Sequence, residues 1–286
     1  MLLTPESPYA VDVRAAQKYG SVPGLPAWQA DRYLDLLLPT PRPPELAPAV
    51  LYLHGGGWRA GERSTGMYPW LSPLLAAHGF VAANVSYRLS GQAPFPAQLY
   101  DVKAAVRWLR ANAEAYGIDP ERVGVWGDSA GGHLAALLGT TAGRADLEGD
   151  CGSAEWPSAV QAVVMRCAPS DFPTMPQENA EVLDALFGGP PSETAELRRL
   201  ASPAEHVHVG VPPFLIVHGT RDEIVPFEQA ETMVRALRAY EREVTFHVVD
   251  GGHHNLLENL DLPLGNDPWA DLGLQALDFF RRTLGT

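Results

Sequence analysis

The stretch that decides the fold is Val123-Gly124-Val125-Trp126-Gly127-Asp128-Ser129-Ala130-Gly131-Gly132-His133. An apolar, strand-like run leads into Gly-x-Ser-x-Gly, and a helix-forming segment follows. Such a sharp turn forces Ser129 into a strained backbone conformation, and side chains at Gly127 or Gly131 would collide with it. The N-terminus of the helix then favours negative charge on the serine oxygen. The pattern predicts Ser129 as a nucleophile; a glycine-rich turn with a capping serine is the alternative.

Short apolar runs alternate with helix-length amphipathic segments on both sides of this stretch. Strands are expected over residues 33–38, 49–53, 81–85, 123–126, 160–165, 214–217 and 244–249. Helices are expected over residues 67–77, 97–116, 130–138, 227–240 and 269–284. This alternation indicates βαβ units, so the predicted fold class is α/β, with a mostly parallel central sheet flanked by helices. Right-handed crossovers place the carboxyl ends of the strands on one edge, where ligands bind.

The segment over residues 172–211 interrupts the alternation with prolines and short helical pieces. We interpret it as an insertion over the sheet edge, either a small cap that covers the substrate or a long decorated loop. The length of 286 residues and the apolar content of 46% fit one large core. The prediction is a single domain over residues 1–286 that carries this insertion.

Three consecutive glycines follow the apolar strand in Leu51-Tyr52-Leu53-His54-Gly55-Gly56-Gly57-Trp58. Such a loop exposes backbone N–H groups and lets a ligand come close. Attack of a serine on an ester creates an oxyanion that preorganised N–H donors must meet. We assign this role to Gly56 and Gly57, with Ala130 as a third donor. His54 is expected to hold the loop in place, while Trp58 and Phe95 are expected to line the substrate pocket, with plain packing as the alternative.

The carboxylate that would orient a histidine is expected in the turn after the strand over 214–217. Asp222 occupies this turn and is the predicted acid. Glu223 is the alternative, and Asp171, which follows the preceding strand, is a more distant one.

The base is expected in the loop after the strand over 244–249, where two glycines precede two histidines. A neutral imidazole can take the serine proton near neutral pH and return it to a leaving group. His253 is the predicted base because it directly follows the glycines, and His254 is the alternative.

Composition and charge bear on partners and location. The net charge of −13 argues against nucleic acid and anionic membranes. The beginning of the sequence lacks the features of a secretory signal and no segment is apolar enough to span a bilayer, so a cytoplasmic location is expected.

Cys151 and Cys167 are expected to be free, with a bridge between them as the alternative. A homodimer is left open.

No metal and no cofactor is expected. The histidine pairs at 206/208 and 253/254 lack a cysteine or carboxylate partner at a recognised spacing.

Together the motifs resemble the esterase/lipase branch of the α/β-hydrolases, the hormone-sensitive-lipase-like and feruloyl- or acetylxylan-esterase-like carboxylesterases. The resemblance covers about residue 36 to the end of the chain. It is carried by His54-Gly55-Gly56-Gly57-Trp58, Tyr87-Arg88-Leu89, Pro94-Phe95-Pro96-Ala97, Tyr116-Gly117-Ile118-Asp119-Pro120, Gly127-Asp128-Ser129-Ala130-Gly131-Gly132, Ala201-Ser202-Pro203, His218-Gly219-Thr220-Arg221-Asp222 and Gly252-His253.

The resemblance implies an α/β-hydrolase fold and a cofactor-free serine carboxylesterase that acts on a small-molecule ester through an acyl-enzyme on Ser129. The order of Ser129, Asp222 and His253 is the order of the triad in this fold. In such families glycine often follows the catalytic histidine, where this chain has His254.

Two other functions compete with this interpretation. Arylformamidase-like amidohydrolases carry a similar His-Gly-Gly-x-Trp loop, which residues 54–58 also satisfy. Some ligand-binding modules share the fold but have lost the catalytic histidine. Here a serine, an acid and a histidine are all present, which favours an enzyme.

Overall fold

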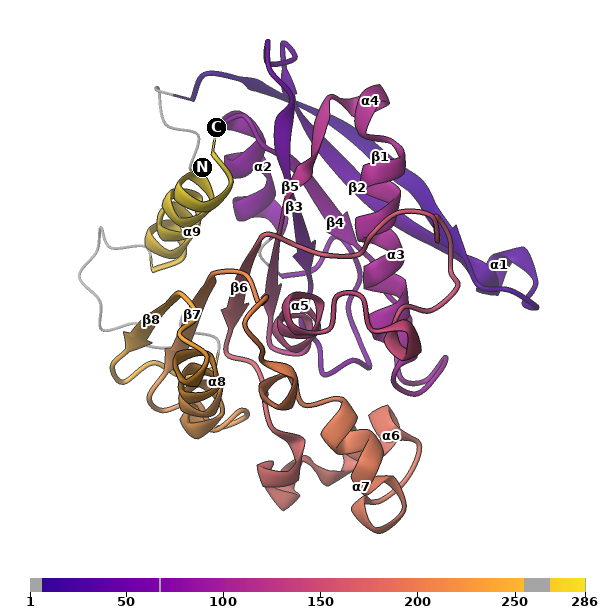
Figure 1. The fold of residues 1–286 in the computed structure, drawn as a ribbon, viewed down its shortest axis with the longest axis vertical. Helices are drawn as coiled ribbons and strands as arrows, with labels where there is room; N and C mark the ends of the chain where they lie inside the picture. Colours follow the sequence, from indigo (N-terminus) through magenta and orange to yellow (C-terminus); the bar gives the residue numbers. More distant parts are fainter. Residues whose placement is uncertain (1–6, 67, 255–267, 286) are drawn as a thin grey trace.

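The computed structural model describes residues 7–66, 68–254 and 268–285, and within them one eight-stranded sheet runs through the molecule (Figure 1). Its strand order is β1-β2-β4-β3-β5-β6-β7-β8. The pairs β1–β2 and β2–β4 are antiparallel, and the pairs from β4 to β8 are parallel. The strands are β1 (Ala10–Ser21), β2 (Asp31–Thr40), β3 (Ala47–Leu53), β4 (Val81–Val85), β5 (Ile118–Asp128), β6 (Ala162–Arg166), β7 (Phe214–Gly219) and β8 (Val244–Val249).

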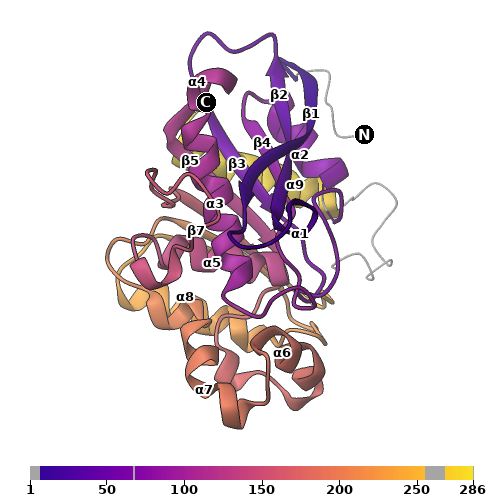
Figure 2. The same ribbon diagram turned by 90° about the vertical axis from the view of Figure 1, so that its right-hand side faces the viewer.

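Helices cover both faces of the sheet (Figures 1 and 2). One face carries α3 (Ala97–Ala111), α5 (Ala130–Thr140) and α8 (Phe227–Ala239), and the other carries α2 (Tyr68–Ala77) and α9 (Pro268–Leu284). Each face has its own buried apolar cluster. The central strands β3, β4 and β6 are buried along their whole length, as expected for parallel strands covered on both sides. No helix in the described ranges has both the length and the apolar character needed to cross a membrane.

The carboxyl ends of the parallel strands share one edge of the sheet. The segment over residues 172–211 connects β6 to β7 there and forms α6 (Ala180–Phe187) and α7 (Pro191–Leu200), which lie beyond that edge (Figures 1 and 2). The backbone N–H of Phe95 donates to the carbonyl of Leu186 at 2.8 Å, which ties α6 to the scaffold. The short elements are α1 (Ala27–Ala30), α4 (Ala113–Tyr116), η1 (Ala145–Leu147), η2 (Phe172–Thr174), η3 (Gln177–Asn179) and η4 (Pro203–His206).

The predicted α/β fold class and all seven predicted strands are confirmed. The structure adds β1, an edge strand in which Tyr19 alone is buried, so its sequence shows no apolar run. The helix expected over 97–116 is interrupted at Asn112, which separates α3 from α4. The expected start of a helix at Met67 lies outside the described residues.

A buried ion pair fastens the loop after β4 to α3. Asp101 on α3 is fully buried and accepts from Arg88 through Nη2 at 2.7 Å, Nε at 2.9 Å and the backbone N–H at 2.8 Å. The thiol of Cys151 donates to the same carboxylate at 3.2 Å. The carboxylate is therefore fully buried with several donors, so removing one partner of the ion pair leaves the other charge buried without its counter-ion.

Replacing Asp101 with alanine is expected to lower the free energy of unfolding by about 3–5 kcal/mol, because it leaves the Arg88 guanidinium buried and unpaired. Urea unfolding monitored by circular dichroism measures the change. The control is Asp278→Ala, which removes the solvent-exposed pair with Arg282 and should cost less than about 1 kcal/mol. Equal losses in the two variants would contradict the structural role of Asp101.

Candidate active site

Ser129 sits on the turn that its sequence predicts, between the end of β5 and the start of α5. Its backbone has φ 52° and ψ −116°, a conformation that costs a non-glycine residue of order 1–3 kcal/mol. A side chain at Gly127 would overlap the backbone of Gly131, and one at Gly131 would overlap the carbonyl of Leu53. The Ser129 N–H donates to the Arg166 carbonyl at 2.8 Å, which holds the turn against β6.

The histidine beside Ser129 is His254. Its Nε2 lies 3.0 Å from Ser129 Oγ, and its Nδ1 lies 2.8 Å and 3.0 Å from the two oxygens of Asp222. The predicted base, His253, instead places Nδ1 3.1 Å from Glu223 Oε2 at the surface. The choice of His253 over His254 is therefore corrected by the geometry.

The backbone before the histidines gives the physical reason for this correction. Gly252 lies so close to Gly219 that a Cβ on Gly219 would overlap the Gly252 carbonyl. The same carbonyl accepts a hydrogen bond from the Arg221 N–H at 2.9 Å. The first side chain after this contact, His253, points to Glu223, and the second points inward. The His254 side chain is 10% exposed and that of His253 is 35% exposed, so only His254 joins the interior of the site.

Asp222 is held as an ionised carboxylate. Although burial favours its neutral form, hydrogen bonds from His218 and His254 keep the pKa of Asp222 well below its usual range. The backbone N–H groups of Ile224 and Val225 donate to Oδ1 at 3.0 Å and 2.8 Å. Because an ionised carboxylate can only accept, neutral His254 carries its proton on Nδ1 and turns the Nε2 lone pair to the Ser129 hydroxyl.

The glycine loop lies against the nucleophile. A Cβ on Gly55 would come within 3.2 Å of the Asp128 carbonyl and 3.5 Å of Ser129 Cβ. Gly56 and Gly57 have φ of 114° and 58°, which favours glycine at both positions. Their N–H groups donate to no backbone acceptor in the described part of the chain, and the N–H of Ala130 at the start of α5 has no partner within its helix.

His54 is fully buried and fixes the start of this loop, as the sequence predicts. Its ring stacks on Tyr87 with the centroids 4.3 Å apart, and the Tyr87 hydroxyl donates to the His54 carbonyl at 2.7 Å. Burial lowers the pKa of His54, which therefore stays neutral. The imidazole is consequently a packing group of the loop.

Trp58 and Phe95 belong to a buried aromatic cluster. They are 4% and 2% exposed, and their ring centroids lie 5.4–6.2 Å from those of His133, Phe172 and Phe187. Trp58 Nε1 donates to His133 Nδ1 at 3.2 Å, and burial lowers the pKa of His133 to about 4. These contacts join the glycine loop to the 172–211 insertion and agree with plain packing, while the pocket-lining role of the two residues stays a prediction.

A charged network lies behind Ser129, and no motif in the sequence predicts it. Asp128 accepts from Trp126 Nε1 at 2.8 Å, from Tyr52 at 2.9 Å and from Arg166 Nε at 2.7 Å. Arg166 also donates through Nη1 to the His254 carbonyl at 3.4 Å. The sequence signal for this network is Arg166 at the end of the apolar run 162–165, because a charge at the end of a buried strand requires a partner of opposite charge.

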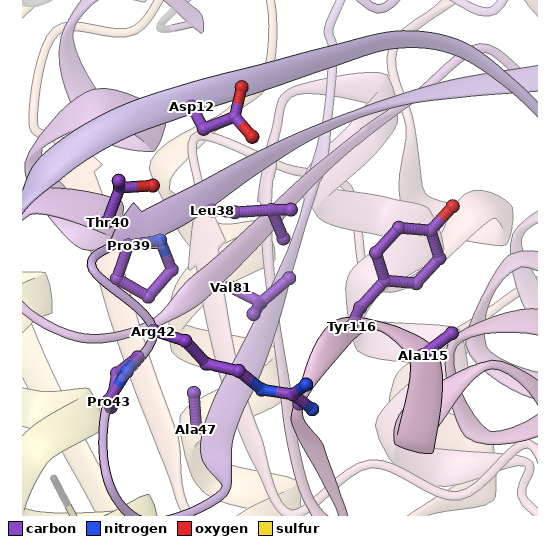
Figure 3. Close-up of a pocket in the computed structure, with 11 residues that line it drawn as sticks. Asp12, Leu38, Pro39, Thr40, Arg42, Pro43, Ala47, Val81, Ala115 and Tyr116 are labelled. Carbon is purple, nitrogen blue, oxygen red and sulfur yellow. The ribbon is translucent and has the colours of Figure 1, made fainter.

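One pocket lies at the opposite edge of the sheet and is separate from this site (Figure 3). Its volume is about 170 Å³, and its lining includes Ala47 and Val81, the first residues of β3 and β4. Ser129 follows the carboxyl end of β5, so the two places lie at different ends of the strands.

Several curated proteins with similar sequences are named esterases. Esterase LipC of Mycobacterium tuberculosis is 36% identical over 228 residues, which are 77% of this chain and 56% of LipC. Esterase LipQ of the same organism is 31% identical over 74% of this chain. The chain spans about half the length of the curated relatives it matches.

Solved structures support the same grouping. A truncated carbohydrate esterase from gut microbiota superposes with a TM-score of 0.81 at 28% identity and covers 98% of this chain and 99% of that one. Esterase 2 of Thermogutta terrifontis, phosphonylated by sarin, gives 0.77 at 26% identity, with 98% and 97% covered. The family model BD-FAE matches residues 34–237. The chain therefore has the α/β-hydrolase fold and belongs to the BD-FAE family.

Proposed function

We propose that this chain is a serine carboxylesterase that hydrolyses short-acyl or aryl carboxylic esters. The observation that carries the proposal is the chain of contacts from Ser129 Oγ to His254 Nε2 at 3.0 Å and from His254 Nδ1 to Asp222 at 2.8 Å. These are the distances at which a base can take a hydroxyl proton and an acid can hold the base in one tautomer.

In the proposed reaction, Ser129 Oγ attacks the ester carbonyl while His254 Nε2 takes its proton. Asp222 stabilises the imidazolium that forms, and His254 then protonates the leaving alcohol. A water molecule activated by the same histidine releases the acid from the acyl-enzyme. The free N–H groups of Gly56, Gly57 and Ala130 are the proposed donors to the oxyanion.

We also propose that the 172–211 insertion serves as a cap. A Cβ built on Gly57 would lie 3.3 Å from Cγ1 of Val182 on α6, so this helix stands close above the proposed oxyanion loop. Such a short approach leaves little room beside the loop, which favours small substituents on the substrate. Hydrolysis rates for p-nitrophenyl esters of rising acyl length, beside acetylated sugars, would define the substrate class.

The Ser129→Ala variant is expected to lose ester hydrolysis by on the order of 10⁴-fold or more, because the attacking oxygen is removed. It should also lose labelling by a fluorophosphonate. Hydrolysis of p-nitrophenyl acetate and mass spectrometry of the labelled protein measure both effects, with circular dichroism as the control for folding. Normal turnover by the folded variant would refute the proposed nucleophile.

The two adjacent histidines supply a matched pair of variants. His254→Ala should lower kcat by roughly 10⁴-fold, since it removes the base, whereas His253→Ala should change kcat by less than about tenfold. Steady-state kinetics with p-nitrophenyl acetate compare them. A larger loss in His253→Ala than in His254→Ala would return the role of the base to His253.

Asp222 should make stability depend on pH in the acid range. Its pKa is lowered in the folded protein, so its ionised form stabilises the fold above the ordinary carboxyl pKa of about 4 and this contribution declines as the pH falls below it. The difference in unfolding free energy between the wild type and Asp222→Asn should therefore shrink from pH 6 to pH 3. Chemical unfolding at each pH measures it, and the exposed Glu223→Gln serves as control. A difference that stays constant would contradict a strongly stabilised carboxylate.

A further inference from the structure

A thiol lies beside two of the three proposed catalytic residues, Asp222 and His254, and has no part in the proposed reaction. Cys167 directly follows β6, is fully buried, and is not in a disulfide. Its Sγ, a carboxylate oxygen of Asp222 and a ring nitrogen of His254 all lie within 4.8 Å of one another. In the described part of the chain, no other group of three such side chains gathers this closely.

Thiolate, carboxylate and imidazole are the ligands that Zn²⁺ and related thiophilic cations bind in proteins. Metal–ligand bonds of about 2.0–2.3 Å place neighbouring ligand atoms roughly 3.5 Å apart in a tetrahedral site. Separations of up to 4.8 Å can therefore close with small movements of the side chains. Mg²⁺ and Ca²⁺ prefer oxygen ligands and do not suit this set.

The charges of the cluster suit a dication once the thiol is deprotonated. One thiolate and one carboxylate balance two positive charges. The neighbouring cation is Arg166, whose Nη1 lies 3.9 Å from Cys167 Sγ, but Asp128 pairs with Arg166 at 2.7 Å and offsets its charge.

We propose that Cys167, Asp222 and His254 form a site for a thiophilic divalent cation such as Zn²⁺, and that the bound cation holds the enzyme inactive. The inhibitory part of this proposal rests on the proposed esterase function. Nδ1 is the His254 nitrogen that faces Asp222, so it is the nitrogen that a cation shared with Asp222 would use.

Occupation of Nδ1 changes the tautomer of the base. In the active form the proton is on Nδ1 and the Nε2 lone pair accepts from Ser129. When the cation takes the Nδ1 lone pair, neutral imidazole carries its proton on Nε2 and can no longer accept the serine proton. The Cys167 thiol releases its proton to solvent as the metal–sulfur bond forms, so one proton leaves for each cation bound.

The second cysteine provides the matched control. Cys151 is also buried and free, but its Sγ lies next to Arg88 at 3.4 Å and Asp101 at 3.2 Å, away from the catalytic histidine. Cys151→Ala therefore removes a buried thiol without touching the proposed site. Cys167→Ser is the second variant at the site, because it keeps the size of the side chain.

The experiment uses the full chain freed of metal with a chelator and then incubated with ZnCl₂, because a buried site fills slowly. Hydrolysis of p-nitrophenyl acetate should be inhibited in the wild type and equally in Cys151→Ala. Cys167→Ala and Cys167→Ser should need at least about tenfold more Zn²⁺ for the same inhibition. Equal sensitivity of the Cys167 variants and the wild type would overturn the proposal.

Direct binding separates failure of this proposal from failure of the esterase assignment. Titration with Cd²⁺ should produce the ultraviolet charge-transfer absorption of a cadmium–thiolate bond in the wild type and in Ser129→Ala, which keeps the three ligands. The band should be absent from Cys167→Ala and present in Cys151→Ala. A wild type without the band, or a band that survives in Cys167→Ala, would refute the site whether or not the protein hydrolyses esters.

Discussion

The tight turn at Ser129 is the constraint on which the rest of the site depends. Ser129 has φ 52°, and the glycines at 127 and 131 allow the backbones of β5, α5 and the end of β3 to come into direct contact around it. The Ser129 N–H also donates to the Arg166 carbonyl, which helps to hold the turn in place. The strain of this turn is offset by the surrounding sheet and helix, which leave the serine no relaxed alternative. The result is a hydroxyl fixed at the carboxyl edge, to which the loops after β3, β7 and β8 bring their own side chains.

Burial distinguishes two chemically similar pairs at this edge. Asp222–His254 and Glu223–His253 are both imidazole–carboxylate contacts of about 3 Å. Only the first is shielded from water, and only its histidine reaches a hydroxyl. A charge interaction is stronger where water is excluded, while an exposed pair contributes little. The environment of each pair, rather than its residue types, therefore determines what it can do.

The parts of the fold predictable from sequence were those with a local signal. Buried parallel strands appear as apolar runs, and the turn at Ser129 has a glycine pattern of its own, so the sequence predicts both. The exposed strand β1 has no such run because it needs no apolar face. The choice between His253 and His254 depends on a contact between Gly219 and Gly252, which are far apart in sequence. Chain order places a histidine in this loop, but only the folded backbone decides which of two neighbours points inward.

The insertion and the glycine loop behave as one packing unit. Trp58 ends the loop, and its ring contacts Phe172 of the insertion. The indole N–H of Trp58 donates to His133, and the other ring nitrogen of His133 is hydrogen-bonded to the carbonyl of Ala201, in the C-terminal part of the insertion. Val182 of α6 also lies close to Gly57, because a Cβ on Gly57 would come within 3.3 Å of its Cγ1. The position of the loop therefore depends on contacts made by the insertion as well as on β3. Interiors are close-packed, so a change in the aromatic contacts would be transmitted to the loop rather than absorbed by empty space. It follows that the insertion proposed as a cap also helps to set the position of the N–H groups of the glycine loop.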